Sequence, residues 1–143
     1  MIVLNTDHPS TASAGRRDRG AIAGWALSAI FAAFMLGASA LPKLAGMPVA
    51  AQTMAELGWP DAPVFWIGVM EAGFTLLYLW RRTALLGAIM MMGVLGGALA
   101  TQIRAGSPLF SHVLFAVYLG AVMWGGLWLR DPSVRAILPL RRG

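Results

Sequence analysis

The stretch from Pro63 to Trp80, PVFWIGVMEAGFTLLYLW, limits the fold more than any other because it places one carboxylate in the middle of an apolar run. A helix of this length spans most of a hydrocarbon core of about 30 Å. An ionisable group at that depth costs roughly 2.5 kcal/mol or more, so it faces protein or a wet cavity rather than lipid. Thr75 and Tyr78 lie four and seven residues after Glu71, on the same helical face. We therefore expect this face to point inward.

The composition excludes several classes of protein. Hydrophobic residues make up 58% of the chain and charged residues only 12%, against about 25% in an ordinary soluble domain. The net charge of +5 does not indicate nucleic-acid binding, because the basic residues lie between apolar runs and not on one water-facing surface. With no cysteine, the chain cannot form a disulfide, attach haem covalently or ligate an iron–sulfur cluster. Any redox chemistry therefore requires a borrowed cofactor.

The order of apolar runs predicts an all-α fold, an integral membrane four-helix bundle. Residues 1–20 are expected to form a disordered cytoplasmic tail, residues 21–130 the transmembrane domain and residues 131–143 a basic cytoplasmic tail. A cleavable signal is the weaker interpretation of the first run, because its apolar part exceeds the usual 7 to 15 residues. The four predicted spans are residues 21–41, 63–80, 83–101 and 109–129.

The connection between the first two spans is predicted to contain a short helix. Pro48 suits a first helical position and Gly58 suits a helix stop. An interfacial cap is favoured over a substrate lid. In the third span, Gly93 and Gly97 form a GxxxG pair, for which close packing within the chain is favoured over dimerisation.

The distribution of basic residues predicts the orientation. Nine basic residues lie before the first span, between the second and third, and after the fourth, whereas the other two connections carry only Lys43 and Arg104. The positive-inside rule then places both termini in the cytoplasm of a multi-pass protein, in the inner membrane if the cell is bacterial.

Polar residues expected in the outer half of the bundle define a candidate site. A cavity among Lys43, Glu71, Arg104 and His112 could hold a quinone head group, with Glu71 as proton acceptor and His112 as donor or proton carrier. Trp66 or Tyr118 would stack on the ring. The alternative is that Glu71 and His112 only hold helices together, and that Lys43 and Arg104 are interfacial anchors. The candidate ligand-binding residues are Lys43, Glu71, Thr75, Tyr78, Arg104 and His112. No metal-ligand spacing, phosphate loop or catalytic triad is present, so no catalytic residue is assigned.

Three stretches resemble the DoxX-like family, small four-helix bacterial membrane proteins. They are SALPKLAG after the first span, ELGWPDAPVFWIGVMEAG leading into the second, and the run from RRTALLGAIM to GGLWLRDP through the third and fourth. The combination of Lys43, Glu71 and the Ser-Pro-x-x-Ser-His sequence ending at His112 carries the resemblance. Members of the wider family are similar to the small membrane subunit of a thiosulfate:quinone oxidoreductase. The resemblance implies association with quinone-linked redox chemistry, while the lack of cysteine argues against independent thiol chemistry.

Three functions follow as hypotheses. The first is an accessory subunit of a quinone-linked membrane redox complex, whose partners are the lipid bilayer, a quinone or other lipid-soluble ligand, and an oxidoreductase subunit. The second is a non-catalytic membrane scaffold. The third is a small proton-coupled transporter, which the charge bias disfavours because that class often inserts in both orientations.

Overall fold

The computed structural model describes residues 11–137, which are helical throughout apart from short connections and contain no strand. This confirms the predicted all-α class. The elements in chain order are α1 (Thr11–Ala33), the π-helix η1 (Phe34–Ala40), α2 (Leu41–Leu44), α3 (Pro48–Glu56), α4 (Val64–Leu79), α5 (Ala84–Arg104), the π-helix η2 (Leu109–Val113), α6 (Phe115–Arg130) and α7 (Pro132–Ile137).

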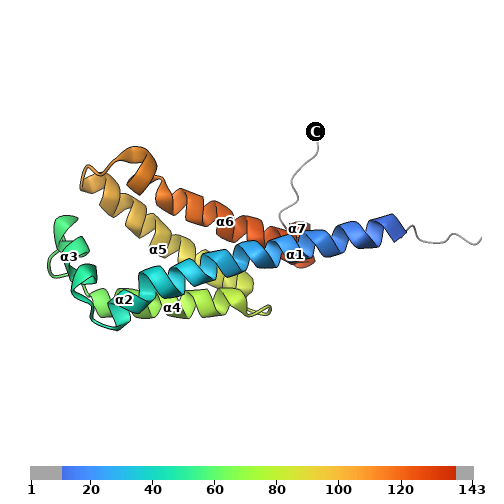
Figure 1. The fold of residues 1–143 in the computed structure, drawn as a ribbon, viewed down its shortest axis with the longest axis horizontal. Helices are drawn as coiled ribbons and strands as arrows, with labels where there is room; N and C mark the ends of the chain where they lie inside the picture. Colours follow the sequence, from blue (N-terminus) through green and yellow to red (C-terminus); the bar gives the residue numbers. More distant parts are fainter. Residues whose placement is uncertain (1–10, 138–143) are drawn as a thin grey trace, which may run out of the picture.

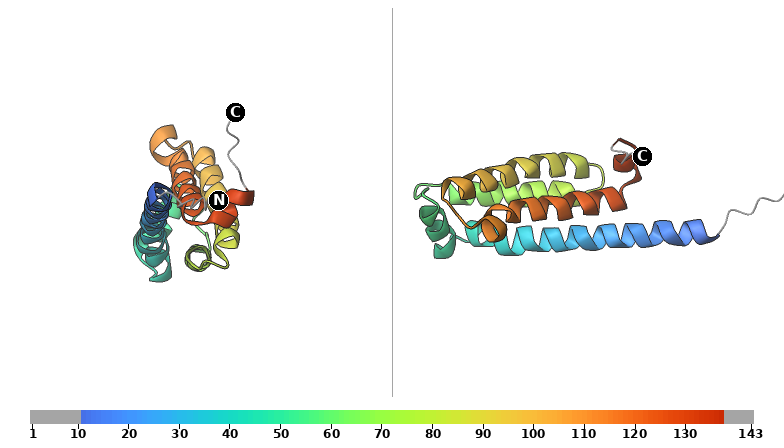
Figure 2. Two further views of the ribbon diagram at one scale, coloured as in Figure 1. Left: turned by 90° about the vertical axis from the view of Figure 1, so that its right-hand side faces the viewer. Right: turned by 90° about the horizontal axis from the view of Figure 1, so that it is seen from above.

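The long helices run side by side, and the contacts between them form a closed ring (Figures 1 and 2). α1 packs along α6, α6 against α5, and α5 against α4, while η1 and α2 return the first helical segment onto α4. α3 and the connection from α5 to η2 lie at one end of the molecule, and α7 packs against the end of α6 at the other (Figures 1 and 2). The first is called the α3 end below and the second the α7 end.

Within residues 11–137, three helical segments are long and apolar enough to cross a membrane: Arg19–Leu44, Ala84–Arg104 and Leu109–Arg130. The predicted second span is shorter in the structure, since α4 has 16 residues. At about 1.5 Å per residue it extends about 24 Å, less than a hydrocarbon core of about 30 Å. The first, third and fourth predicted spans are thus supported by length and composition, whereas the second, residues 63–80, stays a prediction.

The first helix begins earlier than predicted. α1 starts at Thr11, so residues 11–20, expected to be disordered, continue the apolar helix away from the bundle. Alanine and arginine are good helix formers, and adding residues to an existing helix avoids the cost of a new nucleus. The rest of the predicted N-terminal tail, and residues 138–143 of the C-terminal one, lie outside the described residues.

The short helix between the first two spans has the predicted bounds. α3 begins at Pro48 and ends at Glu56, two residues before Gly58. The φ of Gly58 is +76°, a left-handed conformation that favours glycine. A second glycine in this conformation, Gly46 with φ +65°, precedes α3. Two glycine turns therefore bracket the helix.

The closest helix contacts do not involve the predicted GxxxG pair. An added Cβ at Gly93 or Gly97 would meet nothing within 4 Å, so the expected close packing of this pair within the chain is wrong. At Gly24 an added Cβ would lie 2.6 Å from the backbone nitrogen of Arg130, and at Gly126 2.7 Å from the Ser28 hydroxyl. Small residues on α1 and α6 thus let the two helices touch backbone to backbone.

Candidate functional site

The site begins with the π-helix that ends the first long segment. The wider turns of η1 change which residues of this segment face α4, and π segments of this kind are frequent at functional sites. Ser39 and Lys43, four residues apart, both reach Glu71. Gly68 on α4 permits this approach, because an added Cβ there would lie 2.8 Å from the Cβ of Lys43.

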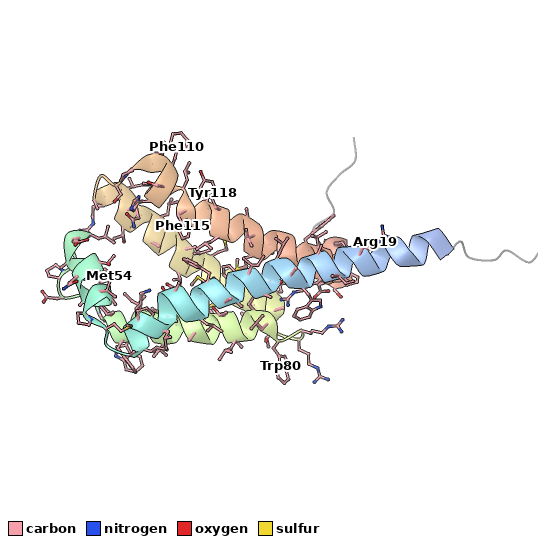
Figure 3. The ribbon with its side chains drawn as sticks, viewed as in Figure 1. Arg19, Met54, Trp80, Phe110, Phe115 and Tyr118 are labelled. Atoms are coloured by element: carbon pink, nitrogen blue, oxygen red, sulfur yellow. The ribbon has the colours of Figure 1, made fainter. Side chains whose placement is uncertain are left out.

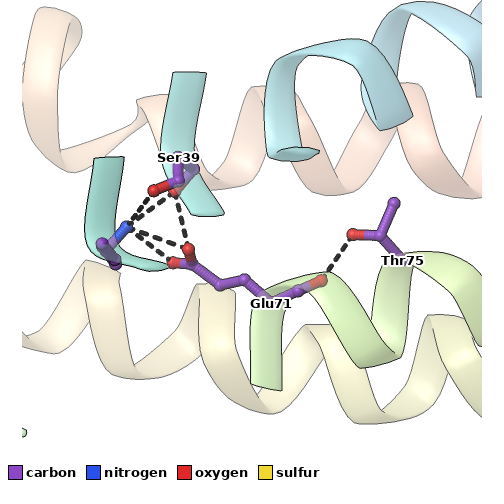
Figure 4. A network of polar contacts seen from close by, with 4 residues as sticks. Ser39, Glu71 and Thr75 are labelled. Carbon is purple, nitrogen blue, oxygen red and sulfur yellow. Dashed lines mark hydrogen bonds and ion pairs between the residues drawn. The ribbon is translucent and has the colours of Figure 1, made fainter. Parts of the chain in front are cut away.

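Lys43 and Glu71 form an ion pair away from bulk solvent (Figure 4). The Lys43 Nζ atom lies 2.9 Å from Glu71 Oε2 and 3.1 Å from Oε1. Only 11% of the lysine side chain and 7% of the glutamate side chain are exposed. Two charges at this separation in a poorly hydrated place attract far more strongly than in water. The carboxylate predicted to be buried therefore has its compensating charge within the same chain.

Ser39 completes the network by bonding to both charges. Its hydroxyl donates to Glu71 Oε2 at 3.0 Å and accepts from Lys43 Nζ at 2.9 Å, and its carbonyl oxygen lies 3.0 Å from the same ammonium. An ammonium carries three N–H groups, and Ser39 and Glu71 supply acceptors for all of them. In this conformation the Ser39–Lys43–Glu71 network is internally satisfied.

A hollow of about 190 Å³ borders this network on the side of α3. Ser39 and Lys43 contribute polar groups to its wall, and Thr53 contributes a third. The volume is many times what one water molecule requires, and a largely apolar wall with a few convergent polar groups is typical of small-molecule sites. The remaining lining residues are Phe34, Ala38, Pro42, Val49, Ala50 and Met54.

α3 forms one wall of the hollow and is fastened at its far end by Arg104. The guanidinium donates to the carbonyl oxygen of Leu57 at 3.0 Å and contacts that of Gly58 at 3.5 Å. These carbonyls lie where α3 stops, so the arginine caps the helix C-terminus and favours its dipole. Arg104, predicted to lie in the ligand site, instead holds the wall of the hollow in place.

The other predicted site residues on α4 bond inside the bundle. The Thr75 hydroxyl donates to the backbone carbonyl of Glu71 at 2.6 Å. The Tyr78 hydroxyl lies 2.8 Å from both the Ser28 hydroxyl and the Met123 carbonyl oxygen, and its ring meets Phe31 edge-on. Thr75 and Tyr78 are fully buried and share the inward face with Glu71, but neither lines the hollow.

The structure does not bring His112 into the network. His112 is exposed on η2, and its Nδ1 atom lies 2.7 Å from the hydroxyl of Ser111. Trp66 and Tyr118, the predicted stacking partners, are also exposed, and Tyr118 projects outward from α6 as Phe110 does from η2 (Figure 3). Of the six predicted residues, the structure therefore joins Lys43 to Glu71 through side chains, and Thr75 to Glu71 through the backbone.

Two residues with important buried contacts, Ser39 and Arg130, were not among the site residues predicted from the sequence. Ser39 stands four residues before Lys43, a spacing that signals a shared helical face. Arg130 was only counted among the basic residues that follow the fourth predicted span, although the structure buries it between α4 and α1. No signal in the sequence distinguishes Arg130 from the other arginines near the C-terminus. Among residues 11–137, no group of three or more His, Cys, Asp or Glu side chains could hold a metal ion.

The DoxX-like family model matches residues 26–126, which is most of the chain. The chain belongs to the DoxX-like family. The match covers the whole of the Ser39–Lys43–Glu71 network and every residue that lines the hollow. No curated protein and no solved structure matches the chain. Together with its apolar helices, family membership makes this DoxX-like chain a membrane protein.

Proposed function

We propose that this DoxX-like protein crosses the membrane four times with both termini in the cytoplasm. α4 packs along the full-length span α5, so the shorter helix is carried at membrane depth by its neighbour. The connection after α4 carries Arg81 and Arg82, whose long side chains reach the interface from a short helix. The orientation rests on the excess of basic residues at the α7 end.

We further propose that the protein binds a lipid-soluble ligand of the quinone type in the hollow, as an accessory subunit of a quinone-linked membrane redox complex. The observation that carries this proposal is that an apolar hollow of about 190 Å³ is bordered by Lys43, one partner of a shielded ion pair, and by Ser39, which bonds to both charges of that pair. A quinone combines an apolar ring with carbonyl acceptors. The wall of the hollow offers hydrogen-bonding groups on Lys43 and Ser39 for the carbonyls and apolar side chains for the ring.

The chemistry requires only an exchange of hydrogen bonds. The Lys43 ammonium donates one N–H to the carbonyl oxygen of Ser39. A ligand carbonyl in the hollow can accept this N–H instead of the Ser39 carbonyl. Glu71 keeps the ammonium oriented throughout, because both of its carboxylate oxygens lie within 3.1 Å of Nζ. Phe34 and Met54 supply apolar contact for the ring. Lys43 is thus the expected ligand-binding residue and Glu71 its positioning residue.

Equilibrium binding of a short-chain ubiquinone or menaquinone analogue to the purified protein in detergent tests the proposal. We expect saturable binding that Lys43→Met weakens at least tenfold, because a charge-assisted hydrogen bond contributes roughly 1.5–3 kcal/mol. His112→Gln is the matched control and should bind as wild type, since His112 lies on the exposed face of η2. Absence of saturable binding, or equal loss in both variants, would contradict the site.

A second function, a scaffold without ligand, is favoured by the closed hydrogen bonding of the network. All acceptors that Lys43 needs come from Ser39 and Glu71 within the chain. If the network only fixes the packing of α2 on α4, replacing both charges by apolar side chains should leave cellular function intact. The same pairing gives no support to the transporter hypothesis, because the membrane carboxylate is already neutralised by a lysine.

A further inference from the structure

The α7 end holds a second buried charge, Arg130, which the proposed quinone site does not use. Arg130 is the last residue of the span Leu109–Arg130 and is only 8% exposed. Its guanidinium lies between two rings, 4.3 Å from the centroid of Trp25 and 4.5 Å from that of Tyr78. Its Nη2 atom donates to the backbone carbonyl of Tyr78 near the end of α4. Arg130 therefore caps α4 from a neighbouring helix.

One nitrogen of this guanidinium lacks an acceptor. Nη1 is buried and has no hydrogen-bond partner among the described residues. An arginine side chain has five N–H donors, and a buried donor left without an acceptor costs about 1–3 kcal/mol, more when it is charged. The stacked rings hold the cation but supply no lone pair of the strength it needs. An external anion would supply the acceptor that this nitrogen lacks.

The charges around Arg130 favour an anion. After Tyr78, the groups whose fields act on Arg130 are Asp131 and, more weakly, Arg81. The Asp131 carboxylate forms no ion pair with Arg130 in the described part of the chain, and its Oδ1 atom accepts from the backbone N–H of Ser133 at 2.9 Å. Arg81 and Arg82 are exposed on the turn between α4 and α5, so this end is basic over a broad surface.

We propose that Arg130 and Arg81 bind the phosphate of an anionic phospholipid. Arg130 ends a span of 22 residues, about 33 Å at about 1.5 Å per residue, so it lies at the depth of the headgroup phosphates. The exposed indole of Trp80 (Figure 3) and that of Trp25, 42% exposed, mark the same interface. The inference rests on the membrane placement proposed above, under which this end meets the leaflet richer in anionic lipid, and is independent of ligand binding in the hollow.

Native mass spectrometry of the full chain with equal amounts of phosphatidylglycerol and phosphatidylcholine tests this inference. We expect wild type to retain phosphatidylglycerol at least tenfold more strongly. Arg81→Gln should reduce that preference about fivefold, corresponding to about 1 kcal/mol per basic residue near the headgroups, and Arg130→Gln should reduce it further. Arg104→Gln removes the same charge at the α3 end and should leave the preference unchanged.

Arg81→Gln keeps the test decisive if Arg130→Gln fails to fold, because Arg81 is exposed on a turn. Equal retention of the two lipids by wild type would overturn the inference. So would a preference that survives Arg81→Gln, or one that Arg104→Gln lowers as much. Displacement of the lipid by millimolar inorganic phosphate would show a site for a free anion and would also overturn it. Loss of quinone binding would leave all these outcomes untouched.

Discussion

Breaking the Lys43–Glu71 ion pair from one side should destabilise the fold strongly, whereas removing both charges should not. Lys43→Met keeps most of the aliphatic stem and deletes the two contacts to Glu71 at 2.9 and 3.1 Å. The carboxylate then keeps only the hydroxyl of Ser39 and remains 93% buried. An uncompensated buried charge of this kind costs about 3–5 kcal/mol.

We expect the lower end of that range, near 3 kcal/mol, for Lys43→Met and for Glu71→Leu, because a tenth of the lysine side chain meets solvent. The double variant Lys43→Met/Glu71→Leu replaces the pair by apolar groups and should lie within about 1 kcal/mol of wild type. The expected coupling energy is therefore about 5 kcal/mol or more in magnitude.

The measurement is a double-mutant cycle by SDS-driven unfolding in mixed micelles, followed by circular dichroism. Single variants within about 0.5 kcal/mol of wild type, or effects that simply add in the double variant, would refute the argument that the pair is shielded and mutually compensated. The double variant also separates the two proposed functions. It should fold but lose quinone binding if the network is a ligand site, and should retain cellular function if it is a scaffold.

Three further outcomes are expected. Gly87→Ala should destabilise the bundle by roughly 1–3 kcal/mol, because its Cβ would collide with the backbone of Tyr78, as measured by the same SDS unfolding. Tyr78→Phe should cost about 1–3 kcal/mol in that assay, since the buried Ser28 hydroxyl and Met123 carbonyl lose their common partner. Arg104→Gln should speed amide hydrogen exchange in α3 severalfold without changing exchange in α5, because it releases the carbonyls at the helix end.

Matched variants separate these effects from general disturbance. Gly93→Ala adds the same methyl group where nothing lies within 4 Å, and should be neutral or stabilising. Tyr118→Phe removes an exposed hydroxyl and should change stability by less than about 0.5 kcal/mol. Arg82→Gln removes a charge far from α3 and should leave its exchange unchanged. Each argument fails if the control moves as much as its partner variant.

The sequence predicted the parts of the fold that depend on local chemistry. Apolar runs gave the long helices, and Pro48 and Gly58 gave the bounds of α3, because helix starts and stops follow from the backbone preferences of single residues. The spacing of Glu71, Thr75 and Tyr78 predicted the inward face of α4. Exposing a carboxylate to lipid is costly, and this cost determines which face of the helix points into the protein.

The parts that depend on tertiary contacts were not predictable. The π-helix η1 sets which residues of the first span meet Glu71, and a pattern of regular period 3.6 does not reveal a local change of period. The choice between Arg104, His112 and Lys43 as partner of Glu71 depended on how helix ends align across the bundle. The burial of Arg130 depended on the glycine contacts of α1 with α6, which bring Trp25 over its guanidinium.

Photo-cross-linking with an azido-quinone, followed by peptide mapping, tests the central claim most directly. If the hollow beside the Ser39–Lys43–Glu71 network is the ligand site, the label should fall within residues 34–54, should be displaced by unlabelled quinone and should be lost in Lys43→Met. Label on η2 or the lipid-exposed faces of α5 and α6, or label in the hollow that excess unlabelled quinone leaves unchanged, would contradict the account.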